Sequence, residues 1–401
     1  MLFTDVVGND AVKQKLITLV AQNRLSHALL FVGKDGSGVL PLALAFANYI
    51  SLNPLQTDSI NAAPDMFGEV ATVQVPTTIA QADAFMQSHP NYGKVTAMVH
   101  PDIHYTYPVI IKKTGDKPLS TEYIKQWRTF IAEQPYSNVF DWLQYIEAEN
   151  KQGNISALEC NEIIRKLSLK SFESEYKILV LWMPEYLGKE GNKLLKLIEE
   201  PPPNTLFILV AQSEEQILQT IISRTQLVKV PLPHNEAIIQ YLRGKTDVVK
   251  AMQITGVCEG NVRDALHLLQ ADGDDWLQLI KDCLNALKKT RAQGMLLWVA
   301  KLNELGRERQ KQFVRYFIHI VALCIRANIT GINSINISDN ERVFVSKLKD
   351  IVTVDTLEEM AILLNEQIYH IERNANAKLL FHALIIRLDY MVNHKNSIAI
   401  V

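Results

Sequence analysis

The feature that most constrains the fold is a buried strand that leads through a glycine-rich turn into an apolar helix. Residues 27–32 form an apolar run that ends at Gly33, as expected of a strand inside a parallel sheet. Gly36 and Gly38 complete the turn, and residues 39–50 have the composition of a buried helix. A strand, turn and helix in this order predict an α/β domain with a doubly wound sheet.

Three further apolar segments have the length and composition of central strands. They comprise residues 176–181, 205–210 and 227–230. Helical periodicity over residues 9–20 and helical patterns between the strands predict helices on both faces of the sheet. Residues 51–100 interrupt this pattern with turn formers and short β-like pieces at 69–75 and 94–99. We interpret this region as an insertion on the edge of the sheet.

The strand signal stops after residue 231, and the rest of the chain has helical patterns. Residues 234–270 contain about three short helices, and the chain from Trp276 onward is helical by periodicity. One segment is apolar on most sides, which predicts a helix at the centre of a bundle. Its apolar residues are Phe313, Val314, Phe317, Ile318, Ile320, Val321, Cys324 and Ile325. We predict three domains, over residues 1–231, 232–272 and 273–401.

Composition narrows the classes of protein that this chain can represent. Its 401 residues allow two or three domains. Hydrophobic residues make up 48% and charged residues 21% of the total, which is typical of a folded globular chain. The formal net charge is -2, so the surface as a whole is not built to grip DNA phosphates.

Nothing in the sequence indicates secretion or a membrane. The first residues do not form a secretory signal. The strongly apolar stretches, such as residues 316–325, are far shorter than the ~20 residues that cross a bilayer. The four cysteines are too few for a disulfide scaffold. We therefore expect no membrane association and a location in a reducing cytoplasm.

The glycine turn has the spacing of a phosphate-binding loop but lacks the residues that perform its chemistry. A working loop reads G-x-x-x-x-G-K-[ST], and Gly33 and Gly38 stand at its two glycine positions. Val39 replaces the lysine that would neutralise phosphates, and Leu40 replaces the hydroxyl that would hold Mg²⁺. Backbone amides near Gly36 could still attract an anion, but we expect no bound nucleotide and no cofactor.

A second element of a nucleotide site is also missing. Carboxylates that organise Mg²⁺ would be expected where the strand around residues 177–181 ends, but the chain continues Trp182-Met183-Pro184-Glu185. Pro184 disturbs the backbone that leads to Glu185, which we interpret as a solvated turn residue or a helix-start acid. Two losses at one site together predict a chain without ATPase activity of its own.

Several ordered segments resemble the bacterial clamp-loader subunits, which are AAA+ proteins that load the sliding clamp of the replicative DNA polymerase. These segments are spread over nearly the whole chain. They are Val7-Gly8-Asn9, Arg24-Leu25-Ser26-His27-Ala28, His100-Pro101-Asp102, residues 192–202 (NKLLKLIEEPP), Ser223-Arg224-Thr225 and Asn374-Ala375-Asn376. The resemblance implies an AAA+ module with a degenerate phosphate loop over 1–231, a helical lid over 232–272 and a helical collar that assembles a ring.

The function implied by the resemblance centres on Arg224. In this family a Ser-Arg-Cys motif supplies an arginine finger to a neighbouring subunit. Ser223 and Arg224 match the motif, and Thr225 replaces its cysteine. Such a guanidinium stabilises charge that develops on a transferred phosphate. The resemblance further implies motor subunits of the gamma/tau type and a delta-type subunit as partners, with the sliding clamp and primer-template DNA reached indirectly.

Other charged residues near these motifs receive structural interpretations. Residues 260–266 resemble the family's lid motif, in which an arginine senses bound nucleotide. Because the phosphate loop looks degenerate, we expect Arg263 in an ion pair within the lid. Glu199 and Glu200 are consecutive and do not share a helix face, so we expect a surface or interface edge there and no acid/base pair.

A bound metal is not expected. Many members of the family bind zinc through four cysteines in the insertion, but the cysteines of this chain lie elsewhere and form no C-x₂-C pair. They are Cys160, Cys258, Cys283 and Cys324. His100 and His104 are close in sequence, but Pro101 opposes the helix that would bring them to one face.

Other classes of function stay open from the residues alone. One alternative is an ATP-hydrolysing AAA+ motor subunit, against which Val39 and Leu40 argue. Another is a structural scaffold without a residue that acts in trans. A DNA-binding enzyme such as a nuclease is more distant, because no constellation of metal ligands supports it.

Overall fold

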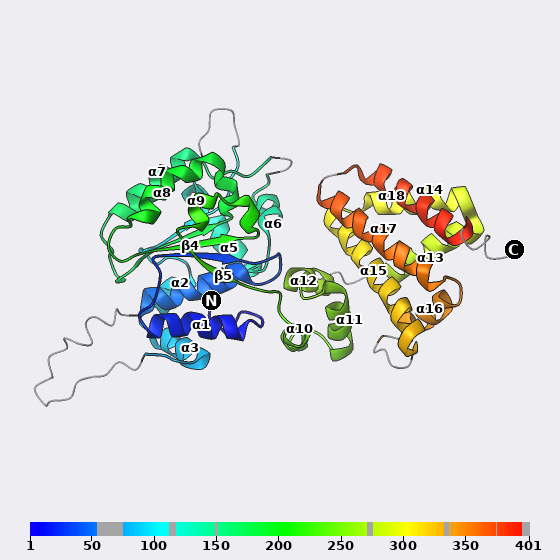
Figure 1. The fold of residues 1–401 in the computed structure, drawn as a ribbon, viewed down its shortest axis with the longest axis horizontal. Helices are drawn as coiled ribbons and strands as arrows, with labels where there is room; N and C mark the ends of the chain where they lie inside the picture. Colours follow the sequence, from blue (N-terminus) through cyan, green and yellow to red (C-terminus); the bar gives the residue numbers. More distant parts are fainter. Residues whose placement is uncertain are drawn as a thin grey trace, which may run out of the picture. The chain divides into compact units, whose positions relative to one another are not determined.

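The chain divides into two compact units in a computed structural model. The structure describes residues 1–53, 75–111, 118–148, 151–270, 276–332, 337, 339–373 and 375–394. The first unit comprises Met1–Ala237 and Gly260–Arg263, and the second comprises Ile238–Glu259 and Asp264–Val401. Figure 1 shows a sheet with its helices in the first unit and helices in the second.

A five-stranded parallel sheet forms the centre of the first unit, in the order β2-β3-β4-β1-β5. The strands are β1 (Ala28–Val32), β2 (Ile103–Thr106), β3 (Lys177–Trp182), β4 (Thr205–Ala211) and β5 (Gln226–Lys229). This confirms the predicted α/β class and the four predicted strands, whereas β2 was not predicted. Because β1 lies between β4 and β5, the turn after β1 opens at the carboxyl edge of the central strands.

Helices cover both faces of this sheet (Figure 1). Strand residues alternate between two hydrophobic cores, so Leu29 and Phe31 contribute to one core, and Ala28 and Leu30 contribute to the other. The helices of the first core are α1 (Asp10–Ala21), α2 (Val39–Leu52), α3 (Ile79–Ser88), α4 (Tyr92–Thr96), α5 (Ile124–Glu133) and α6 (Val139–Tyr145). The helices of the second core are α7 (Ala157–Ser168), α8 (Asn192–Glu199) and α9 (Gln219–Ile222).

The described part of the region 51–100 is helical and packs into the first core. Buried Asp83 on α3 accepts hydrogen bonds of 2.8 and 2.9 Å from backbone N–H groups at the start of the chain. The predicted β-like piece at 94–99 is wrong, because helix α4 covers its first part and Val95 is fully buried there. Almost all of the piece predicted at 69–75 lies outside the described residues. An insertion on the sheet edge stays a prediction.

Two buried carboxylates fix the short strand β2. Asp102, just before the strand, accepts a hydrogen bond of 2.7 Å from each backbone N–H of residues 172–174. Glu159 on α7 accepts hydrogen bonds from the Thr106 hydroxyl at 3.1 Å and from the Ser120 N–H at 2.8 Å. The His-Pro-Asp segment therefore has a structural role, in which its acid ties β2 to the loop before β3.

The described part of the second unit is built of helices, as predicted. Two helices, α10 (Asn235–Arg243) and α12 (Val262–Gln270), begin in the first unit and continue in the second. The others are α11 (Val248–Cys258), α13 (Trp276–Asn285), α14 (Arg291–Glu304), α15 (Arg307–Thr330), α16 (Asp339–Lys349), α17 (Val354–Glu372) and α18 (Ala377–Asp389). Helix α15 packs against α11, α13, α16 and α17, which confirms the predicted central helix.

Among the described residues, α15 is the one helix long and apolar enough to cross a membrane, judged by length and composition only. Its 24 residues extend beyond the apolar stretch noted in the sequence. Phe313, Phe317 and Ile320 on this helix are fully buried in the core of the second unit. We therefore interpret α15 as a core helix of the bundle.

Polar contacts join the small helices α11 and α12 to the bundle helices within the second unit. Arg315 on α15 pairs with buried Asp264 on α12. Glu341 on α16 accepts hydrogen bonds from the Gln253 side chain at 3.1 Å and from the Tyr316 hydroxyl at 2.8 Å. A separate lid over 232–272 stays a prediction, and its joint near 272 lies outside the described residues.

Candidate functional site

The glycine turn after β1 is fixed by two segments that are distant in the sequence. Gly36 has a φ of 72°, and a Cβ atom there would collide with the Asn261 side chain, so backbone conformation and space both require glycine. The backbone N–H of Val262 donates to the Gly36 carbonyl oxygen at 3.1 Å. The side-chain amide of Asn9 donates to the Ser37 carbonyl oxygen at 3.1 Å. The start of α1 and the start of α12 therefore both hold the turn.

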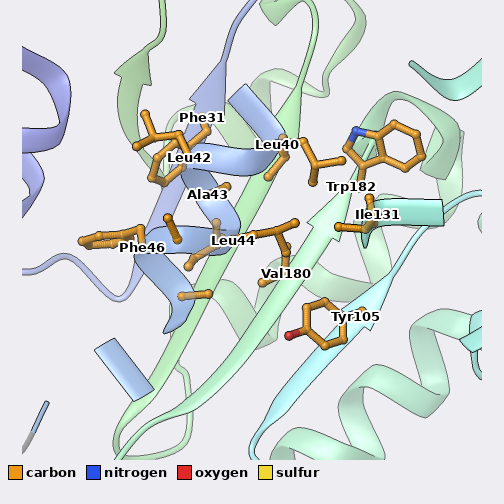
Figure 2. Close-up of a cluster of buried hydrophobic side chains, with 14 of the residues drawn as sticks. Phe31, Leu40, Leu42, Ala43, Leu44, Phe46, Tyr105, Ile131, Val180 and Trp182 are labelled. Atoms are coloured by element: carbon orange, nitrogen blue, oxygen red, sulfur yellow. The ribbon is translucent and has the colours of Figure 1, made fainter. Parts of the chain in front are cut away.

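The pocket beside the turn is almost filled by side chains. Leu40 is buried in the same hydrophobic cluster as Trp182 (Figure 2), and Val39 is half-buried. The cavity volume is about 20 Å³, which is room for about one water molecule. Besides residues of the turn and α2, the pocket is lined by Pro135, Tyr136, Ser137, Trp182, Met183, Val210, Ala211 and Gln212. A nucleoside triphosphate would have to displace these side chains to enter.

A carboxylate at this pocket has the wrong charge for binding phosphate. Asp35 lines the pocket and accepts hydrogen bonds from the side-chain amides of Asn138, at 2.8 Å, and Gln212. These bonds tie the turn to the start of α6 and to the end of β4. The negative charge of Asp35 would repel a phosphate group, while Lys34, which also lines the pocket, is exposed to solvent.

Glu185 occupies the region where an acid of a nucleotide site would be expected. It lies in the first turn of the 3₁₀ segment Pro184–Gly191, in agreement with the predicted helix-start acid, but it is half-buried, so the predicted solvated position is wrong. Its Oε1 accepts hydrogen bonds from the backbone N–H groups of Gln212 at 2.7 Å and Ser213 at 3.3 Å. Burial raises the pKa of the Glu185 carboxyl, and these hydrogen bonds oppose that rise. Its contacts are those of a structural acid at the end of β4.

Arg263 forms a buried ion pair, but the partner is not the one expected. Its Nε and Nη2 donate to Oδ2 and Oδ1 of Asp141 at 2.6 Å each. The Arg263 side chain is 2% exposed and that of Asp141 is 9% exposed. The predicted ion pair is confirmed, whereas its predicted place within the lid is wrong, because Asp141 lies on α6. This two-pronged contact holds the start of α12 against α6 within the first unit.

Arg224 lies in a turn between α9 and β5, as predicted, and its side chain is 33% exposed. Its Nη1 donates to the Thr220 carbonyl oxygen at 2.8 Å and to the Ser223 hydroxyl at 3.1 Å. Its Nε and Nη2 both contact Oε1 of Glu199, the last residue of α8. Thr225 closes the turn, since its hydroxyl donates to the Ile221 carbonyl at 3.2 Å.

The contact between Glu199 and Arg224 was not predicted from the sequence. The two residues are 25 positions apart on separate elements, and the acid was expected only to form a surface or interface edge. The His27 ring, just before β1, lies 2.9 Å from the Ile198 carbonyl oxygen. This contact places the end of α8 beside β1, which is the neighbour of β5. The sheet order therefore brings the pair together, and a local pattern could not reveal it.

The residues considered for a metal are dispersed. Among the residues that the structure describes, no group of three or more His, Cys, Asp or Glu side chains is gathered for a metal ion. All four cysteines are buried, and none of the four forms a disulfide. Burial lowers the pKa of His104 to about 4 and raises the pKa of Cys160 to about 11. The absence of a bound metal stays a prediction.

Comparison with known proteins points to one family. The family model described as DNA polymerase III, delta subunit, matches residues 80–234. That range contains β2 to β5 and the turn with Arg224. A solved structure of a gamma subunit-related protein of DNA polymerase III from Thermotoga maritima has 14% sequence identity and a TM-score of 0.37. This alignment covers 94% of this chain and 99% of that one.

Two relatives have related descriptions. The chain is 27% identical over 191 residues to DNA polymerase III subunit gamma of Buchnera aphidicola, which covers 40% of this chain and 53% of that relative. It is 38% identical over 78 residues to DNA polymerase III subunit delta' of Haemophilus influenzae, which covers 20% of this chain and 24% of that relative. The chain thus spans about half or less of the length of these curated relatives.

Proposed function

Because the chain belongs to the bacterial clamp-loader family of DNA polymerase III subunits, we propose that it is a non-motor, delta-prime-like subunit of such a loader. In this role it hydrolyses no ATP itself and presents Arg224 to ATP that a neighbouring motor subunit binds. Its partners are motor subunits of the gamma/tau type and a delta-type subunit in the cytoplasm. It acts on the sliding clamp and on primer-template DNA through these neighbours, in keeping with its net charge of -2.

The observation that carries this proposal is the contrast between a filled pocket and an arginine at the surface. The cavity at the phosphate loop measures about 20 Å³, and Val39 and Leu40 supply neither a cation nor a metal ligand. Arg224 is 33% exposed in a surface turn. A guanidinium in such a place can reach the phosphates of another subunit and stabilise the charge of the transition state.

Replacement of Arg224 tests the proposal in a loader reconstituted with its motor and delta-type subunits. Arg224→Ala should slow hydrolysis at the served site by roughly 10³–10⁵-fold, since the finger stabilises phosphate charge. DNA-stimulated ATP turnover is the measurement. Arg165→Ala is the matched control, because Arg165 is also exposed and paired with a glutamate, Glu162. Full turnover in the Arg224→Ala loader would contradict the finger and favour a scaffold.

An ATP-hydrolysing motor subunit is the second candidate, because several relatives are described as gamma or tau subunits. A fluorescent ATP analogue titrated against the isolated chain separates the two candidates. The filled pocket leads us to expect no Mg²⁺-dependent binding at micromolar concentrations. Binding of that kind would overturn the non-motor assignment and establish a nucleotide site in this chain.

A further inference from the structure

We propose that Glu199 is a positioning residue for Arg224, which orients the guanidinium for the phosphate of a neighbouring subunit. This inference rests on the proposed finger function of Arg224. The carboxylate of Glu199 lies at the end of α8 and contacts Nε and Nη2 of Arg224 through one oxygen, Oε1. No local sequence pattern links the two residues, which are 25 positions apart.

The guanidinium is supported from two directions. On one side, Nη1 donates to the Thr220 carbonyl at 2.8 Å and to the Ser223 hydroxyl at 3.1 Å. On the other side, Nε and Nη2 contact the carboxylate of Glu199. The two supports come from separate elements, so together they restrict both the direction and the rotation of the planar group. An arginine oriented in this way loses less conformational freedom when a phosphate arrives.

Exposure argues that the pair serves more than the stability of the fold. The Arg224 side chain is 33% exposed and that of Glu199 is 44% exposed. Ion pairs with this degree of exposure are screened by solvent and contribute little to folding stability. Orientation of a functional group is a role that such a pair can fill, because functional side chains need hydrogen-bonding partners that hold their geometry.

The contacts leave the arginine able to bind a further anion. A guanidinium carries five N–H donors in a fixed fork. One carboxylate oxygen, one carbonyl oxygen and one hydroxyl oxygen receive its contacts within the chain. The four contacts leave one of the five donors, an N–H of Nη2, and a third of the side chain remains open to solvent. Glu199 therefore orients the finger without occupying all of it.

Variants of two adjacent glutamates test the inference, since Glu200 is also exposed and lies one residue beyond α8. The first measurement is the water-exchange rate of the Arg224 Nε–H, followed by NMR in the full chain. Glu199→Ala should raise that rate about tenfold, because the acceptor is lost. Glu200→Ala should leave it unchanged.

The second measurement is ATP turnover of the reconstituted loader with each variant. Glu199→Ala should lower kcat at the site that Arg224 serves by about 3- to 10-fold and leave KM for ATP unchanged, since misorientation affects the transition state more than ATP binding. Glu199→Gln should recover most of the loss, because its amide oxygen still accepts the Nε–H. Glu200→Ala should behave as wild type.

Each contrary result identifies what has failed. Unchanged kcat in Glu199→Ala, with a large loss in Arg224→Ala, would overturn the positioning role alone. A raised kcat in Glu199→Ala would also overturn it, because the acid would then be masking the finger. Unchanged turnover in Arg224→Ala would reject the proposed function itself, and the positioning role would fall with it.

Discussion

Two of the arginines that pair with carboxylates in the first unit lie in opposite surroundings. Arg263 is 2% exposed and makes a two-pronged contact with Asp141 beside the phosphate loop. Arg224 is 33% exposed and meets Glu199 at a surface turn. The buried pair holds two segments of the fold together, whereas the exposed pair leaves a cation available to a neighbouring molecule. Burial decides which arginine serves structure and which can serve chemistry.

Burial and exposure also distinguish the two regions that contain these arginines. At the phosphate loop, the Gly36 carbonyl oxygen accepts a hydrogen bond from the Val262 N–H, and the Asp35 carboxylate accepts one from the Asn138 side-chain amide. The cavity there is almost filled. This turn, which has the glycine spacing of a phosphate loop, joins segments that are distant in the sequence. In the turn at Arg224, the guanidinium is partly exposed at the surface.

Loss of the buried arginine should have the largest effect on stability. Arg263→Ala removes the cation that faces the buried Asp141 carboxylate, so we expect the free energy of unfolding to fall by about 3–5 kcal/mol. Urea-induced unfolding is the measurement. In a double-mutant cycle with Arg263→Met and Asp141→Asn, the double variant should lose less than the sum of the single losses. A loss below about 1 kcal/mol for Arg263→Ala would contradict the structural role.

Restoration of the missing phosphate-loop residues should not restore nucleotide binding. Val39→Lys combined with Leu40→Thr supplies the lysine and hydroxyl, but the cavity of about 20 Å³ remains filled by its lining side chains. The Leu40 change also removes buried apolar surface, so we expect a loss of about 2–3 kcal/mol in stability. Fluorescent-ATP titration checks the first expectation. If the double variant binds ATP in a Mg²⁺-dependent way, the pocket can open. The filled cavity would then not explain why the wild-type chain binds no nucleotide.

Loss of the exposed arginine should barely change the stability of the chain. Arg224→Ala removes a solvent-screened pair, so the free energy of unfolding should change by less than about 1 kcal/mol. Thermal and urea unfolding of the isolated chain are the measurements, with Arg165→Ala as the matched exposed arginine. A loss as large as that of Arg263→Ala would remove the contrast between the two arginines.

The smallest expected effect concerns pH and the buried acid of the phosphate-loop region. Burial raises the pKa of Glu185 above the ordinary value of 4.5. The unfolded chain therefore loses this proton at a lower pH than the folded chain does. In the pH range between the unfolded-state pKa and the higher folded-state pKa, the free energy of unfolding falls as pH rises. Glu185→Gln should abolish that slope and stabilise the chain by less than about 1 kcal/mol above the window.

Urea unfolding of wild type and Glu185→Gln at several pH values checks the sign. Below pH 4.5 the two proteins should have nearly equal stability, because the acid is protonated in both folded and unfolded chains. If Glu185→Gln instead becomes less stable than the wild type as pH rises, the folded chain prefers the carboxylate. That result would make Glu185 a charged acid in the region where a nucleotide site would need one.

Local patterns in the sequence predicted much of the fold, and non-local contacts account for what they missed. Composition identifies the apolar runs that became β1, β3, β4 and β5, although β5 is as short as β2. Strand β2 has four residues and takes its place from Asp102 and Glu159, whose partners are 39 to 72 positions away. The piece at 94–99 was misread because so short an apolar pattern does not distinguish a strand from one helical turn.

The candidate site shows the same limit. Gly33, Gly38, Val39 and Leu40 could be assigned because they belong to one short local motif, and Arg224 was found by resemblance. The acids that pair with the two arginines are 25 and 122 positions from them. Such partners depend on the order of strands and on the packing of helices, so a single sequence does not reveal them.

The central claim is that this chain acts on ATP held by a neighbour and binds none itself. Native mass spectrometry of the assembled loader, with Mg²⁺ and a non-hydrolysable ATP analogue, counts the nucleotides in each assembly. Our account predicts one nucleotide for each motor subunit and none for this chain, with the same count in the Arg224→Ala loader. A count that exceeds the number of motor subunits by the number of copies of this chain would contradict it.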